Sequence, residues 1–435
     1  MTNKFRYVSF ALICVVLQFN QTFAKQETLS KEVNQMSSCP QIMPVKLKED
    51  LDFLFNSINE IHPNMYAYTN KEEFDPLRNK LYNQIDHPMT CLEFYKLVAP
   101  VVSALKNGHT LISPPINLFQ EYLQKGGKVF PFELCWYGQN AILANYYGQI
   151  AVPLGAAILE INGKDIRHVI TGFARYFPAE RKDSSPWILE DDTLFWFCLW
   201  LEYGATESLN LKVKTIEGEL KRYDIKAITL EDITATLMTR NKALKVGYTH
   251  RFIPEYNACL VRFDSFGPEL TKNIENTFRE IRQNKVTNLI IDIRKNPGGS
   301  SVPGDELIKY LTDKPFRQFE QEKIKISSQS KSRIPDELNL GKDGSLVNVN
   351  QPFIQPGNNP YRFTGKVFVL TGPLIASSSM SFASVIKCFN IGNLIGQETG
   401  DATVNYGDSH ECYVVNIMNA VTTPNSVVMY LLPEQ

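Results

Sequence analysis

Three consecutive serines, Ser377 to Ser379, stand between an apolar run at residues 366–371 and an apolar segment with helical character. The first run is typical of a buried strand, and open α/β sheets bind ligands at the carboxyl ends of such strands. A helix that begins there directs backbone amides outward and favours negative charge at its start. One of these serines could therefore be a nucleophile beside an anion site. The serines could equally form a helix cap and a turn, because serine is a favoured N-cap residue.

A turn-forming segment, Asn296-Pro297-Gly298-Gly299, follows a second apolar run at residues 286–294. Paired glycines allow backbone amides to approach a ligand closely. If both apolar runs are strands of one parallel sheet, this turn lies at the same edge as the serines. Its amides could then form an oxyanion hole. An ordinary loop between a strand and a helix is the alternative.

A serine nucleophile needs a base, and the chain contains six histidines. His109 lies where a helical segment gives way to a strand, between Gly108 and Thr110. It is the best candidate for the base, although a structural or merely exposed histidine is the alternative. The other five have less in their favour: His62, His87, His168, His250 and His410.

The elements that must position these residues fall into three parts. Helical periodicity over residues 45–107 predicts helices, with a capping box formed by Thr90 and Glu93. Short β-rich runs follow, with an Asn-Gly hairpin turn at 162–163 and a suspected insertion at 173–200. Alternating strands and helices then predict βαβ units and a parallel sheet. The polar stretch 316–362 is expected to be a long insertion that could form a mobile loop.

The bulk composition is that of an ordinary globular protein. The chain has 435 residues, 43% of them hydrophobic, and a formal net charge of -1. The near-zero net charge argues against non-specific binding to nucleic acid or to an anionic membrane. The cysteines form no CxxC pair, which gives no metal or redox motif.

The first 24 residues predict a secretory signal peptide. Lys4 and Arg6 precede a short apolar core at residues 8–17, and cleavage is expected near Ala24. The apolar core is shorter than the roughly 20 residues that span a bilayer. We therefore expect a secreted or periplasmic protein without a stable membrane span after cleavage.

Taken in order, these motifs resemble one family, the serine peptidases related to C-terminal processing proteases and the tricorn protease core. The quoted segments are LKNGHT, ILEINGKDI, DIRKNPGG, VFVLTGPLIASSSMSFA and IGQETGDATVNYGD, and they cover roughly residues 100 to 410. The resemblance implies a multidomain α+β protein. Its parts would be an N-terminal helical domain (25–115), a PDZ-like β-rich domain (116–245) and an α/β catalytic domain (246–435, insertion 316–362). The catalytic domain would contain a mostly parallel, crotonase-like or ClpP-like sheet.

The resemblance also implies roles for individual residues. Ser377 would be the nucleophile, and His109 the base, because the lysine of the processing proteases has no counterpart here. The amide of Ser378 and the Gly298-Gly299 loop would form the oxyanion hole. Glu398 is the candidate for orienting His109, with a purely structural carboxylate as the alternative. No metal or cofactor is implied, and the substrate would be a peptide or an unfolded protein.

Two departures from the family keep the function open. The glutamate common three residues after the nucleophile is Met380 here, and the sequence ends at TTPNSVVMYLLPEQ without the family's usual closing segment. The chain could thus be a secreted serine endopeptidase. It could also be a C-terminally truncated, catalytically impaired relative that binds extended peptides in its PDZ-like groove. A non-peptide esterase is disfavoured, because no G-x-S-x-G surrounds Ser377. The sequence makes no prediction of the oligomeric state.

Overall fold

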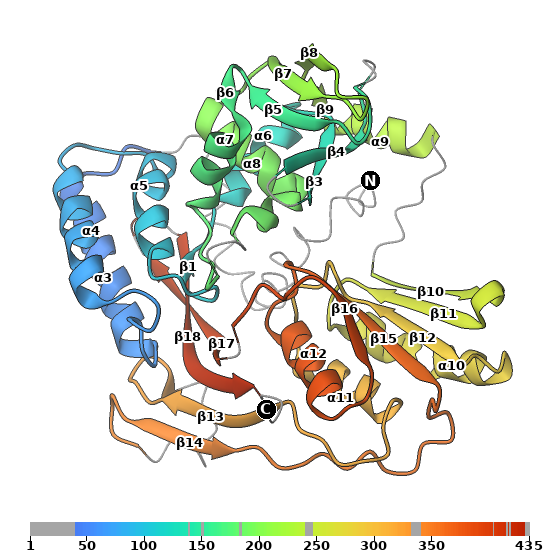
Figure 1. The fold of residues 1–435 in the computed structure, drawn as a ribbon. Coiled ribbons are helices and arrows are strands. Elements are labelled where there is room, and N and C mark those ends of the chain that lie inside the picture. The colour runs from blue at the N-terminus through green and yellow to red at the C-terminus, as the bar shows by residue number, and fades with distance from the viewer. Residues whose placement is uncertain are drawn as a thin grey trace.

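The computed structural model (Figure 1) describes most of the chain beyond the predicted signal peptide, which lies outside the described residues. The described residues are 40–137, 140–148, 152–181, 185–239, 247–331, 341–402, 404–414, 416 and 419–430. Within these ranges, no helix is both long enough and apolar enough to cross a bilayer.

The N-terminal helices form where the sequence predicts them and lie side by side in Figure 1. The helices are α3 (Pro44–Ile61), α4 (Lys71–Gln84) and α5 (Cys91–Ser103), and α6 (Ile116–Gln124) follows after a short strand. The capping box at the start of α5 is confirmed, since the side chain of Thr90 and that of Glu93 each accept from the other's backbone N–H. Cys91, the first residue of α5, is disulfide-bonded.

An antiparallel sheet with an attached group of helices follows. Its strand order is β3 (Phe132–Tyr137), β4 (Asn140–Tyr146), β5 (Ala157–Ile161), β7 (Ser208–Lys214) and β8 (Leu220–Lys226), with β6 (Lys164–Asp165) paired to β5. The hairpin predicted at the Asn-Gly pair is confirmed: Asn162 and Gly163 have φ values of 50° and 74°, as a type I′ turn requires. The remaining elements are α7 (Ile166–Ala174), η1 (Ser185–Glu190), α8 (Asp192–Tyr203), and the β2–β9 pair (Lys128–Val129, Ile228–Thr229) with α9 (Leu230–Thr239).

The N-terminal helices and the antiparallel sheet share one hydrophobic core. Phe197 of α8 is fully buried and contacts the rings of Tyr95 and Phe119, with centroids 6.2 and 5.9 Å away. The stretch 173–200, expected to be an insertion, therefore supplies a central core helix, which explains its high apolar content. The domain boundary at 115/116 stays a prediction.

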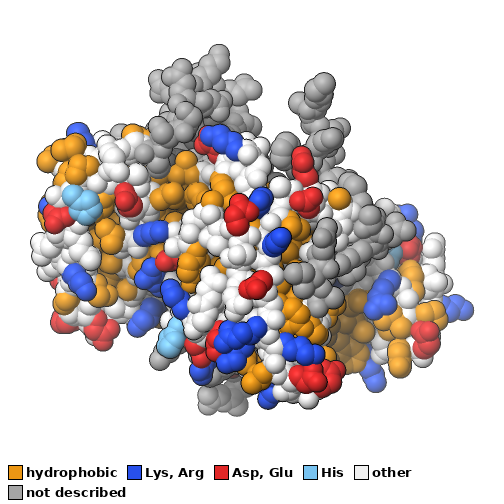
Figure 2. All heavy atoms as spheres, turned by 90° about the horizontal axis from the view of Figure 1, so that it is seen from above, with side chains coloured by type: hydrophobic (Ala, Val, Ile, Leu, Met, Phe, Trp, Pro, Cys, Tyr) orange, Lys and Arg blue, Asp and Glu red, His pale blue; other side chains and the backbone are white. Residues whose placement is uncertain are grey.

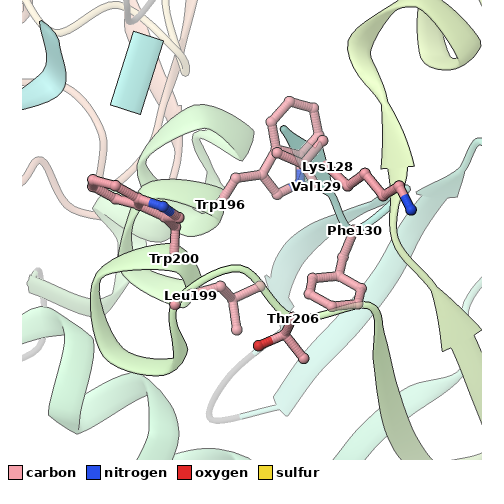
Figure 3. Close-up of a pocket in the computed structure, with 8 residues that line it drawn as sticks. Lys128, Val129, Phe130, Trp196, Leu199, Trp200 and Thr206 are labelled. Atoms are coloured by element: carbon pink, nitrogen blue, oxygen red, sulfur yellow. The ribbon is translucent and has the colours of Figure 1, made fainter. Parts of the chain in front are cut away.

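A small pocket between β2 and α8 is lined by Val129, Phe130, Leu199 and Trp200 together with neighbouring side chains (Figure 3). Its volume of about 10 Å³ leaves room for about one water molecule. The pocket is thus a packing gap in the core, too small to hold a peptide or a cofactor.

The parallel sheet predicted for the C-terminal part is present. Its order is β10 (Tyr248–Ile253), β11 (Ala258–Phe263), β12 (Asn288–Asp292), β15 (Lys366–Thr371) and β16 (Asn393–Gly396), and the β10–β11 pair is antiparallel while the others are parallel. The helices α10 (Pro268–Gln283), α11 (Ser301–Lys309) and α12 (Ser378–Cys388) pack on it and complete a second hydrophobic core. A single-turn helix, η2 (Pro254–Tyr256), joins β10 to β11.

A third sheet joins distant parts of the chain. Its order is β1 (Leu111–Ile112), β18 (Asn419–Tyr430), β13 (Phe319–Lys325) and β14 (Leu346–Asn350), and β17 (Val404–Val414) also pairs with β18. The expected insertion at 316–362 stays a prediction, but two parts of it form strands, β13 and β14, where a mobile loop was considered. The reason is a short alternation of apolar residues within polar surroundings, which packs Ile324 and Ile326 against Val347 and Val349.

Replacing Phe197 by alanine should lower the free energy of unfolding by about 3–5 kcal/mol, because it removes a fully buried ring. Tyr137→Ala is the matched control, since this aromatic ring is 79% exposed and should change the stability by less than about 0.5 kcal/mol. Denaturant-induced unfolding measures both. Equal effects of the two changes would contradict the shared core.

Candidate active site

The two loops singled out in the sequence meet at one edge of the parallel sheet. Strands β12 and β15 run side by side, with Asp292 opposite Leu370, so the loops after both strands begin at the same edge. A Cβ atom placed on Gly298 would lie only 2.8 Å from the Cβ of Ser377. A side chain at position 298 would therefore collide with Ser377, and only glycine leaves room for the Ser377 turn.

Ser377 precedes α12 and has an unusual backbone conformation. Its φ of 52° and ψ of -128° are rare for a residue with a side chain. Its hydroxyl makes no capping hydrogen bond to the helix, which argues against the simple N-cap interpretation. The backbone N–H of Ser377 instead donates to Oδ2 of Asp401.

The neighbouring serines hold α12 against the glycine loop. The Ser378 hydroxyl donates to the carbonyl oxygen of Gly299 at 2.5 Å, and the Ser379 hydroxyl donates to Oδ1 of Asn296 at 2.7 Å. Two of the three serines therefore have a structural role. Ser377 differs from both by its strained backbone and its position before the first helical residue.

Asn296 is the centre of the glycine loop. Its fully buried side chain accepts the Gly298 N–H at 2.9 Å through Oδ1 and donates from Nδ2 to the carbonyl of Phe263 at 3.2 Å. The Gly298 N–H thus already donates to the Asn296 side chain and is not available to bind an oxyanion. Within the described part of the chain, the amides of Gly299 and Ser378 donate to no protein acceptor. These two amides could bind an oxyanion.

His109 lies in the loop between α5 and β1. Oδ1 of Asn107 accepts the His109 N–H at 3.2 Å and the Thr110 hydroxyl at 2.9 Å, which fixes the loop. The Nδ1 atom of His109 is buried and has no hydrogen-bond partner among the described residues. A Cβ atom placed on Gly108 would lie 3.9 Å from Oδ1 of Asp401. The His109 loop therefore passes near Asp401, the residue that accepts the N–H of Ser377.

The other histidines are placed less well for this chemistry. Burial and the charge of Lys325 lower the pKa of His62 to about 3, and its Nδ1 accepts the Asn64 N–H at 3.0 Å. His250 lies 3.0 Å from a carboxylate oxygen of Glu280. His87 and His168 are exposed, and the side chain of His410 lies outside the described residues.

The structure does not bring Glu398 to His109. The Glu398 side chain is 76% exposed and forms an ion pair with Arg181. This arrangement favours the structural alternative for Glu398, a carboxylate that ties down its own loop.

Two carboxyl groups that the sequence reasoning missed lie nearer to the site. Asp401 is 8% exposed and contacts Ser377. Glu180 accepts the Ala402 N–H at 2.9 Å, and burial, with the nearby Asp401, raises the pKa of Glu180 to about 8. Asp401 directly follows the quoted IGQETG motif, but nothing in the local sequence marks Glu180. In the described ranges, no cluster of three or more His, Cys, Asp or Glu is arranged to hold a metal ion.

Gly298→Ala should destabilise the protein by more than the cost of its backbone conformation alone. Gly344→Ala is the matched control, because Gly344 also has a positive φ, 85° against 114° at Gly298, but no neighbouring atom within 4 Å. The control should cost about 1–2 kcal/mol from conformation, and Gly298→Ala about 1–3 kcal/mol more from overpacking against Ser377. Thermal unfolding of both variants measures the difference, and equal losses would show that Gly298 does not pack against Ser377.

Part of the chain matches a known protein family. Residues 257–407, about a third of the chain, match the family model of peptidase family S41, and this segment contains Ser377 and the glycine loop. No curated protein sequence matches the chain.

Solved structures share the fold at low sequence identity. Mature CPAF has a TM-score of 0.60 and 12% identity, with 88% of this chain and 89% of that chain covered. Mature CPAF in complex with lactacystin has a TM-score of 0.59 and 12% identity, covering 88% and 90%. A mutant of CPAF has a TM-score of 0.61 and 11% identity, covering 90% and 91%. The family model that matches residues 257–407, peptidase family S41, is the family that the ordered motifs predicted.

Proposed function

We propose that the protein is a serine peptidase in which Ser377 is the nucleophile and His109 the general base. The observation that carries this proposal is the strained Ser377, which makes no capping hydrogen bond and stands beside the unengaged amides of Ser378 and Gly299. The match of the surrounding segment to peptidase family S41 supports the class of reaction.

The reaction would proceed in two stages. The Ser377 hydroxyl oxygen attacks the carbonyl carbon of the scissile peptide bond while His109 accepts the hydroxyl proton. The tetrahedral oxyanion is bound by the Ser378 and Gly299 amides, and the start of α12 adds a favourable dipole. His109 then gives the proton to the leaving amine. Water, deprotonated by His109, hydrolyses the acyl-enzyme and returns Ser377 to its free form.

The proposal refines the oxyanion hole expected from the sequence. Because Oδ1 of Asn296 accepts the Gly298 N–H, we assign the oxyanion to the Gly299 and Ser378 amides. Gly298 contributes space for the Ser377 turn. Glu398 has the structural role described above, because its exposed carboxylate pairs with Arg181.

We also propose that the protein is exported and acts on peptides or unfolded proteins. The predicted signal peptide and the disulfide at Cys91 are consistent with an oxidising compartment. The antiparallel sheet β3–β8 would hold an extended substrate by strand addition, as PDZ-like sheets do. On the face shown in Figure 2, Lys and Arg side chains are interspersed with Asp and Glu, which supports the expectation that nucleic acid is not a partner.

Hydrolysis of an unfolded, fluorescently labelled protein by residues 25–435 tests the catalytic pair. Ser377→Ala should abolish hydrolysis while the thermal unfolding midpoint stays within a few degrees. His109→Ala should reduce the rate by about 10²–10⁴-fold, because it removes the general base. His168→Ala, an exposed histidine of α7, is the control and should retain the wild-type rate.

If the Ser377→Ala variant hydrolysed the substrate at the wild-type rate, Ser377 could not be the nucleophile. A folded wild-type chain without hydrolysis would instead favour the peptide-binding relative, and binding of extended peptides would then be measured.

Asn296→Asp tests the arrangement of the glycine loop. The aspartate can still accept from Gly298 and Ser379, but it loses the donor to Phe263 and puts a negative charge beside the oxyanion. We expect kcat/KM to fall by about 10²-fold, comparable to the loss of one oxyanion donor. Asn284→Asp, the same change at an exposed residue that directly follows α10, should leave kcat/KM unchanged. A wild-type kcat/KM for Asn296→Asp would show that the loop does not bind the oxyanion.

A further inference from the structure

Strand β14 forms an open edge of the third sheet. It pairs with β13, and it pairs with no other strand among the described residues. Figure 1 shows β14 at the outer margin of that sheet. Leu346 is 50% exposed, and Asn348 and Asn350 on the same face of the strand are exposed as well. The unpaired backbone N–H and C=O groups of such an edge are a template for a further strand.

The hydrogen bonds to β13 show which backbone groups of β14 face outward. The Ile326 N–H donates to the Ser345 carbonyl at 2.9 Å, and the Gly344 N–H donates to the Ile326 carbonyl at 2.8 Å. Bonded positions recur at every second residue of an antiparallel ladder, so Val347 and Val349 also direct their N–H and C=O groups toward β13. The groups that point away from the sheet belong to the alternate residues Leu346, Asn348 and Asn350.

The sequence of β14, LVNVN, lacks the features that usually protect an edge strand. Charged residues, proline and a very short strand are the common forms of protection. Among the described residues, β16 is an edge strand of only four residues. The longer edge strands all contain charged residues, including Glu133 in β3, Lys221 in β8, Arg251 in β10 and Asp408 in β17. Only β14 combines an extended edge with an uncharged sequence in this part of the chain.

The free edge of β14 is complementary to itself. In a second copy related by a two-fold axis through Asn348, the strand runs antiparallel, so Asn348 faces Asn348 and Leu346 faces Asn350. Each of these residues has outward-facing N–H and C=O groups, so each opposed pair exchanges two hydrogen bonds and all outward groups of the strand are paired. No like charges meet across the axis, because β14 carries no ionisable side chain.

The same pairing extends a small apolar cluster. The side chains of Ile324 and Ile326 are buried, and the half-buried side chains of Val347 and Val349 pack against them. In the antiparallel pair, Val347 of one copy lies opposite Val349 of the other, at a non-hydrogen-bonded position where side chains approach most closely. The apolar cluster of one copy would therefore continue into that of the second.

We propose that β14 is a homodimer interface, in which the strands of two copies pair antiparallel about Asn348 and join the two third sheets into one. This interface goes beyond the proposed function and does not depend on Ser377 or His109 being catalytic. A paired edge of five residues is small beside the roughly 1,600 Å² of a standard protein interface. We therefore expect a reversible dimer with a dissociation constant of about 1 µM or weaker.

Sedimentation velocity of residues 25–435 tests the association, at concentrations from about 1 to about 100 µM, where a weak dimer of this size should form. The wild type should shift from monomer to dimer as the concentration rises. Asn348→Lys should abolish this shift, because it places two like charges opposite each other at the axis. Its thermal unfolding midpoint should stay within a few degrees of the wild type, since Asn348 is exposed. Asn393→Lys, the same change at an exposed residue of the edge strand β16, is the matched control and should dimerise like the wild type.

Oxidative cross-linking tests the register independently. In the Asn348→Cys protein, the two Cα atoms at the axis would be about 5.5 Å apart, which is within the range of a disulfide. Mild oxidation should therefore link two copies through position 348, as mapped by mass spectrometry. Asn350→Cys is the control on the same exposed face. Its two Cα atoms would be roughly 14 Å apart, from a rise of about 3.4 Å per residue, so it should form no such link.

A folded wild type that stays monomeric throughout this range would overturn the proposal. So would a dimer that survives Asn348→Lys, because the two copies would then meet through another surface. Equal cross-linking of Asn348→Cys and Asn350→Cys would contradict the pairing about Asn348. If Asn348→Lys failed to fold, the cross-linking of the two cysteine variants would decide.

Discussion

A hydrogen bond from the Ser377 amide to the Asp401 carboxylate holds the turn on which the proposed chemistry depends. The backbone conformation of Ser377 costs on the order of 1–3 kcal/mol for a residue with a side chain, so it persists only where its surroundings enforce it. Gly298 packs against the Cβ of Ser377, and Asn296 fixes both Gly298 and Ser379. The parallel sheet brings these contacts together, because β12 and β15 end at the same edge.

The position of the proposed base, His109, depends on a different part of the molecule. The His109 loop leaves α5, which belongs to the first hydrophobic core, and enters β1, which pairs with β18 near the end of the chain. Lys325 of β13 strengthens this junction by donating to the carbonyls of Asn59 and His62 at the end of α3. The position of the His109 loop thus depends on the third sheet as well as on the first core.

Features that depend on interactions between residues close together in the sequence could be predicted. The capping box at Thr90, the Asn162-Gly163 turn and the alternating strands and helices of the C-terminal part all depend on neighbouring residues. The ordered motifs also predicted the peptidase family. Strands β13 and β14 escaped prediction because only a few apolar residues alternate within a polar stretch.

The polar part of the site was harder to predict for a physical reason. Which groups a carboxyl group contacts depends on chain segments far away in sequence: Glu180 accepts the N–H of Ala402, 222 residues later. The spacing of apolar residues along the sequence, which predicts helices and strands, gives no information about such contacts. The orienting role predicted for Glu398 relied on family resemblance, and the ion pair with Arg181 places that side chain at the surface.

The location of a covalent adduct tests the central claim most directly. Residues 25–435 would be treated with a fluorophosphonate, digested and mapped by mass spectrometry, beside the Ser377→Ala variant. The account predicts one modified peptide carrying the adduct on Ser377, and none in the variant. An adduct on Ser378, Ser379 or a serine elsewhere, formed equally in Ser377→Ala, would contradict it.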